Sequence, residues 1–93
     1  MNKDLRYKFV TMVVQEQANK VIGSMENDVL DGHATEMPPR DEIEDTVYRE
    51  VMDTGHVFIA GGLRPVQKDI RFLSTPAIKM LVNIIVEQTL EDS

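Results

Sequence analysis

The residues best suited to binding a ligand lie in a short segment that combines two glycines with three basic side chains. Gly61 and Gly62 are adjacent, and Arg64, Lys68 and Arg71 follow closely. Adjacent glycines before a helix can expose backbone N–H groups, and the helix dipole attracts anions there. Arginine and lysine bind phosphate oxygens through charge-assisted hydrogen bonds. The segment therefore predicts a site for a phosphate-bearing ligand such as a nucleotide.

The same segment also has a simpler interpretation. Its glycines do not follow the spacing of a P-loop or a dinucleotide-binding loop. Pro65, which lies among the basic residues, has no N–H to donate. A tight turn that leads into an ordinary surface helix explains the sequence as well, so the phosphate site is the alternative hypothesis for function.

A second candidate site is the acidic segment in the middle of the chain. Residues 26–54 hold ten acidic and two basic residues, in a chain of net charge −6. Asp41, Glu42, Glu44 and Asp45 are the densest group. Carboxylates at this density repel DNA phosphates, so we do not expect nucleic acid as a partner. They are suited to a basic protein surface, while the alternative is a solvated face that keeps the protein soluble.

No residues form a recognisable catalytic or metal-binding pattern. The chain has no cysteine, and its histidines, His33 and His56, lie far apart in the sequence. A zinc site requires four ligands arranged as a tetrahedron, and a nucleophile requires a base within reach. We therefore expect a protein that is not an enzyme and uses no metal ion or cofactor.

Length and composition are typical of one small domain that covers residues 1–93. The charged N-terminus is not followed by an apolar segment of the kind found in secretory signals. The longest apolar stretch, residues 80–86, is too short to span a bilayer. Together with the absence of cysteine, these features favour a cytoplasmic protein that does not enter the membrane.

The first predicted helix covers residues 3–31, where apolar residues recur every three or four positions. Gly32 would end it, because glycine adopts the left-handed conformation common after helices. Such a helix measures roughly 43 Å, whereas a compact globule of this chain length is roughly 32 Å across. The helix must therefore break near Gly23 or extend beyond the globule towards a partner.

The middle of the chain predicts one clear helix and one ambiguous region. Residues 41–54 show helical spacing, with Asp41 at the capping position. Residues 66–73 favour a short helix with Pro65 in its first turn. In the alternative, residues 70–72 form a strand that pairs with residues 57–59.

The last predicted helix, residues 75–90, is apolar around most of its circumference. Only Lys79, Asn83 and Glu87 form a thin polar line along it. A helix of this kind must be covered on more than one side, which three short neighbours do not easily achieve. We expect an all-α domain of three or four helices that is completed by homo-oligomerisation. A tight monomeric bundle is the alternative, and the β-branched residues between 82 and 86 leave a strand open as well.

These features favour a small acidic interaction protein without enzymatic activity, which binds and modulates another macromolecule through Asp41, Glu42, Glu44 and Asp45. Its expected partners are a second copy of itself and an unidentified protein. A nucleotide-like ligand near Gly61 is the alternative. In type, such a short, acidic chain without motifs resembles the accessory proteins of phages and mobile elements.

Overall fold

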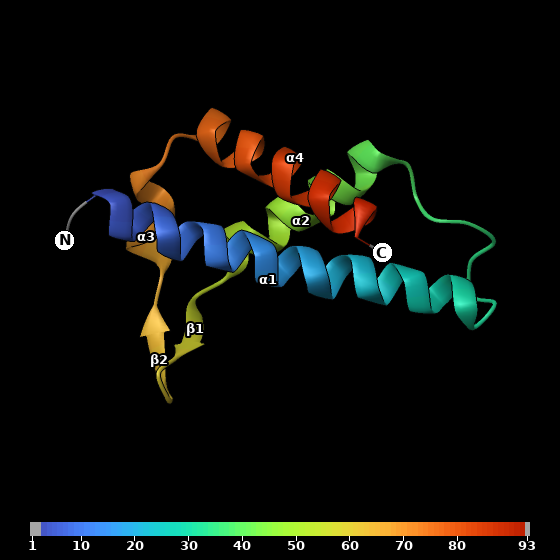
Figure 1. Cartoon of the computed structure of the whole chain (residues 1–93), viewed down its shortest axis with the longest axis horizontal. Coiled ribbons are helices and arrows are strands. Elements are labelled where there is room, and N and C mark those ends of the chain that lie inside the picture. The colour runs from blue at the N-terminus through green and yellow to red at the C-terminus, as the bar shows by residue number, and fades with distance from the viewer. Residues whose placement is uncertain (1–2, 93) are drawn as a thin grey trace.

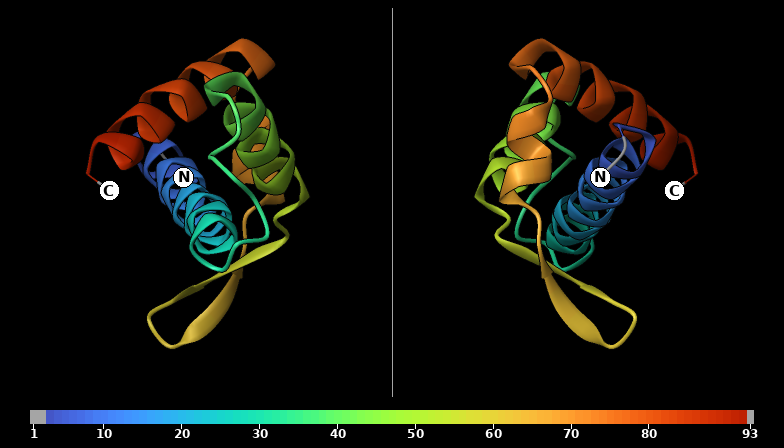
Figure 2. Two further views of the ribbon diagram at one scale, coloured as in Figure 1. Left: turned by 90° about the vertical axis from the view of Figure 1, so that its right-hand side faces the viewer. Right: turned by 90° about the vertical axis from the view of Figure 1, so that its left-hand side faces the viewer.

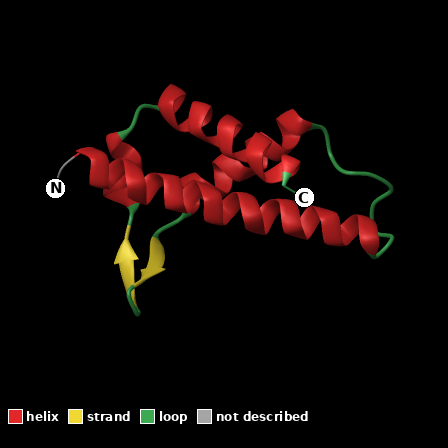
Figure 3. Ribbon diagram, in the orientation of Figure 1, coloured by secondary structure: helices red, strands yellow, loops and turns green. Residues whose placement is uncertain are grey.

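Helices make up most of the fold, and one small hairpin of strands projects from them. The computed structural model describes residues 3–92. Its elements are α1 (Lys3–Leu30), α2 (Arg40–Asp53), β1 (His56–Ile59), β2 (Gly62–Pro65), α3 (Gln67–Phe72) and α4 (Thr75–Glu91). The helices α1, α2 and α4 pack against one another as the body, and the hairpin extends away from it (Figures 1, 2 and 3). The mainly helical prediction is therefore confirmed, but the all-α class is wrong because of the hairpin.

The long helix α1 sets the longest dimension of the molecule (Figure 1). It runs unbroken for 28 residues, and the molecule measures 45 × 30 × 22 Å. The break considered near Gly23 does not occur. Ile22 is buried and Met25 packs against the core, and this burial outweighs the roughly 1 kcal/mol that glycine costs within a helix. Gly32 follows the end of α1 with a φ of 81°, as the sequence predicted.

The core of the body consists of aliphatic side chains from all three long helices. α1 contributes Val10, Val13, Val14, Ala18 and Ile22, α2 contributes Ile43, Val47 and Val51, and α4 contributes Ile78, Leu81, Val82, Ile85 and Val86. The predicted polar line on α4 is exposed. However, Met80 and Ile84 on α4 are also 66% and 44% exposed, so one copy of the chain does not cover that side of the helix.

The region between residues 56 and 74 confirms the short helix predicted over residues 66–73, which is α3, and rejects the alternative strand at residues 70–72. β1 pairs with β2 in antiparallel register, with Ile59 opposite Gly62. Ala60 and Gly61 therefore form the two-residue turn, and both have positive φ, as a type I′ turn requires. The predicted strand at residues 70–72 belongs instead to α3. Pro65 ends β2 rather than starting a helix.

The predicted N-terminal cap is confirmed for α4 but not for α2. The Ser74 side chain accepts a hydrogen bond from the Ala77 N–H at 3.3 Å, which confirms the predicted cap of α4. By contrast, Asp41 lies within the first turn of α2, because the helix starts at Arg40 directly after Pro39. Asp41 still lies where the helix dipole favours a negative charge.

No helix within residues 3–92 combines the length and apolar character that a membrane span requires.

Candidate functional site

The acidic residues predicted to bind a partner divide into two groups on α2. Asp41, Glu42 and Asp45 are exposed, whereas Glu44 is turned towards α4. The Arg49 guanidinium forms an ion pair with Asp45 one helical turn away. Neither Asp41 nor Glu42 forms an ion pair with another residue in the described part of the chain. The charge available to a partner therefore comes mainly from the first turn of α2.

Glu44 instead helps to join α2 to α4. Its carboxylate accepts hydrogen bonds from Arg40 Nε at 3.0 Å and from Asn83 Nδ2 at 3.1 Å. Arg40 also lies 3.6 Å from the Glu87 carboxylate and donates to the Asn83 carbonyl oxygen. Partial desolvation lowers the pKa of Arg40, but the hydrogen bonds to Glu44 and Glu87 outweigh it, and the pKa is raised above its ordinary value. Glu44 is thus committed to a contact within the chain.

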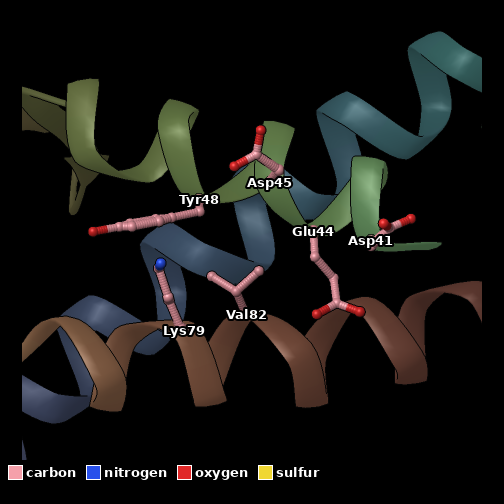
Figure 4. Close-up of a pocket in the computed structure, with 6 residues that line it drawn as sticks. All are labelled: Asp41, Glu44, Asp45, Tyr48, Lys79 and Val82. Atoms are coloured by element: carbon pink, nitrogen blue, oxygen red, sulfur yellow. The ribbon is translucent and has the colours of Figure 1, made fainter. Parts of the chain in front are cut away.

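A shallow groove runs between α2 and α4 beside these carboxylates (Figure 4). Its volume is about 190 Å³, and its lining consists of Asp41, Glu44, Asp45, Tyr48, Lys79 and Val82. The Lys79 ammonium lies 5.2 Å from the centre of the Tyr48 ring and closes one end. Asp41 lies at the other end, so the open end of the groove is acidic.

The residues predicted to bind phosphate are only partly brought together. Gly61 and Gly62 lie at the tip of the hairpin, and β2 separates them from α3, so their N–H groups are not at a helix start. Arg64 and Lys68 line one hollow of about 440 Å³, while Arg71 does not line it. The predicted glycine-to-helix geometry is therefore wrong, although two of the three basic residues share one hollow.

A buried carboxylate, which the sequence did not indicate as special, organises this region. Asp69 is 6% exposed and lies between two arginines: Arg6 Nε is 3.9 Å and Arg64 Nη2 is 4.0 Å from its oxygens. The Arg6 guanidinium lies 4.6 Å from the ring centre of Phe72, and that of Arg64 lies 3.9 Å from that of Phe9. This cluster, hereafter the Asp69 cluster, joins α1, β2 and α3. The signal for Asp69 in the sequence was that it is the one acidic residue among the four basic residues between Arg64 and Lys79.

The two histidines lie apart from both hollows. His33 follows α1 and lies 3.9 Å from the Asp28 carboxylate, while His56 is exposed on β1. Over residues 3–92, no three His, Asp or Glu side chains are grouped as metal ligands would be.

Apolar side chains are exposed on the hairpin as well as on α4. Phe58 and Leu63 lie opposite each other across the two strands and are 71% and 68% exposed. Val57 and Ile59 point to the other face and pack towards the core. The hairpin therefore presents one apolar face away from the body.

Comparison with known proteins assigns the chain to no group: no protein family, curated protein or solved structure matches it.

Proposed function

We propose that this chain is a non-enzymatic interaction protein of the cytoplasm that self-associates and binds a basic surface of another macromolecule through α2. The observation that carries the proposal is the exposed first turn of α2. There, Asp41 and Glu42 have no ion-pair partner among the described residues, and Asp41 borders the groove shared with α4. These carboxylates contribute nothing to the core, so their charge is available for binding.

The groove is suited to the side chain of an arginine or lysine from the partner. Tyr48, which is partly exposed, supplies apolar surface along which the methylene groups of such a side chain pack. Asp41 and Asp45 would pair with its charged end. Lys79 occupies the opposite end and repels a cation there, which fixes the direction from which the partner side chain enters.

The test compares two variants that each remove three negative charges. The first is Asp41→Asn, Glu42→Gln and Asp45→Asn, which leaves Glu44 and its contacts with α4 intact. The control is Asp31→Asn, Glu36→Gln and Glu91→Gln, at exposed positions away from α2. Binding of a fluorescent decalysine peptide is measured by anisotropy at several salt concentrations.

We expect the α2 variant to bind about tenfold more weakly and the control to retain most of the affinity. Exposed ion pairs contribute up to about 1 kcal/mol each and weaken with salt. Equal losses in both variants would mean that only net charge matters, and the proposed site on α2 would be rejected.

Self-association through α4 is supported by the side of the helix that one chain leaves uncovered. Met80 and Ile84 are exposed on α4, whereas the other large apolar side chains of this helix are buried or partly buried. A second copy that covers them removes apolar surface from water at about 25 cal/mol per Å². Two-fold pairing is the commonest way to achieve this in soluble proteins.

Light scattering at several protein concentrations tests the proposal. We expect an oligomer that dissociates when Met80→Lys and Ile84→Lys are combined. The control combines His33→Lys and Thr35→Lys, because both residues are exposed in the loop before α2 and the pair adds the same two charges. A wild-type protein that stays a single copy at high concentration would overturn self-association and leave the α2 proposal untouched.

A further inference from the structure

A hollow with a basic lining lies at the junction of α1, β2 and α3. Its volume is about 440 Å³, within the range of about 300–1,000 Å³ typical of small-molecule sites. The lining is Arg6, Arg64, Pro65, Gln67, Lys68 and Asp69. Three cations and one carboxylate therefore share the hollow, in a protein whose overall charge is negative.

The Asp69 carboxylate lies close enough to position both arginines, but it accepts no hydrogen bond from Arg6 Nε. Asp69 lies 3.9 Å from Arg6 Nε and 4.0 Å from Arg64 Nη2, beyond hydrogen-bond length. The buried Nε of Arg6 has no hydrogen-bond partner among residues 3–92. A buried donor left unsatisfied costs about 1–3 kcal/mol, a cost that Asp69 does not relieve at this distance.

Aromatic side chains hold the guanidinium groups in place. Arg6 lies over Phe72 and Arg64 lies over Phe9, so neither long side chain has to be ordered when a ligand binds. Planar guanidinium groups that are held in advance lose less entropy on binding an oxyanion than flexible lysines do. The hollow is thus preorganised for an anion.

A second hollow adjoins the first and indicates which kind of group the ligand has besides its anionic group. It is about 530 Å³ in volume, shares Arg64 and Pro65 with the basic hollow, and extends past Phe9 and Ile59 to the hairpin turn. Its remaining lining is uncharged. We infer that the two hollows together bind a small organic phosphate of the nucleotide type, with Arg6, Arg64 and Lys68 contacting the phosphate. The less polar part of the ligand then lies beside Phe9.

Calorimetric titration of the full chain with inorganic phosphate, AMP and ATP tests the inference. We expect both nucleotides to bind more tightly than inorganic phosphate, because only they can use the second hollow. Lys68→Gln should weaken AMP binding about tenfold or more, the effect of one charge-assisted hydrogen bond. Arg71→Gln is the matched control, because it removes the same charge from α3 outside the hollow, and it should change affinity less than twofold.

A further variant, Arg6→Lys, keeps the charge beside Asp69 but removes the planar guanidinium held over Phe72 and should also weaken AMP binding. Thermal unfolding of each variant without ligand establishes that it is folded. The inference is overturned if no probe binds, or if Lys68→Gln and Arg71→Gln lose affinity equally. It is also overturned if a DNA duplex binds at low salt while AMP does not, because the hollow would then recognise a polymer backbone.

Discussion

The helical body and the hairpin with α3 are held together by different kinds of contact. In the body, buried valine, isoleucine and leucine side chains from α1, α2 and α4 form the core. The hairpin and α3 add Val57, Val66 and Ile70 to that core, but they also depend on the Asp69 cluster and on hydrogen bonds at the hairpin base. Apolar burial stabilises without direction, whereas ion pairs and hydrogen bonds fix position. The difference indicates that the helical body contributes most of the stability, whereas the polar contacts of the hairpin and α3 fix the positions of their side chains.

Shortening a fully buried side chain of the body should have the largest effect. Ile43 is 2% exposed at the start of α2. The change Ile43→Ala should lower the free energy of unfolding by about 2–5 kcal/mol through lost burial and a residual cavity. Urea denaturation measures the loss. Hydrogen exchange should accelerate in the body and the hairpin together, and acceleration in α2 alone would show that the body is not one cooperative unit.

Removing the carboxylate of the Asp69 cluster should have the next largest effect and should act locally. Asp69→Ala leaves two arginines close together without an opposing charge and should cost about 1–3 kcal/mol. We expect hydrogen exchange to accelerate more in β1, β2 and α3 than in α4. The control is Asp45→Ala, which breaks an exposed ion pair with Arg49 and should cost less than about 0.5 kcal/mol. Equal costs for the two changes would contradict a positioning role for Asp69.

Much of the body could be predicted from the sequence because its signals are local. Apolar spacing located α1, α2 and α4, and Ser74 and Gly32 marked two of their ends. Whether α1 breaks at Gly23 could not be decided locally, because the answer depends on what packs against both sides of that glycine.

The hairpin and the Asp69 cluster could not be predicted in the same way. Asn-Gly or Asp-Gly is the usual signal for a type I′ turn, and here the turn is Ala60-Gly61. Arg6 and Asp69 are far apart in the sequence, so no pattern of spacing links them. The candidate phosphate residues were therefore grouped by sequence proximity, so the group contained Arg71 but not Arg6, which lines the same hollow as Arg64 and Lys68.

Gln67 offers a more local test of how the hairpin is attached. Its side-chain amide donates to the carbonyl oxygens of Met52 and Thr54, at 3.2 and 2.5 Å, and so connects α3 to the end of α2. Gln67→Ala should cost about 1–2 kcal/mol, because both bonds are partly buried. The amide of Val66, which donates to Gly55 at the hairpin base, should exchange faster in the variant. Unchanged exchange there would show that apolar contacts alone hold the hairpin in place.

The turn at the tip of the hairpin should give the smallest effect, and one of opposite sign. Ala60 has a φ of 51°, a conformation that costs most residues with a side chain roughly 1 kcal/mol but that asparagine adopts readily. Ala60→Asn should therefore raise the free energy of unfolding by about 0.5–1 kcal/mol, whereas the β-branched Ala60→Val should lower it. Thermal unfolding of the two variants measures both changes.

Combining the turn variant with a change in the Asp69 cluster tests how the hairpin is coupled to the body. If the coupling runs through the Asp69 cluster, the gain from Ala60→Asn should disappear when it is combined with Asp69→Ala, because the tip then unfolds separately from the core. An undiminished gain in the double variant would show that the tip is coupled to the body by another route, namely the apolar contacts of Val57 and Ile59.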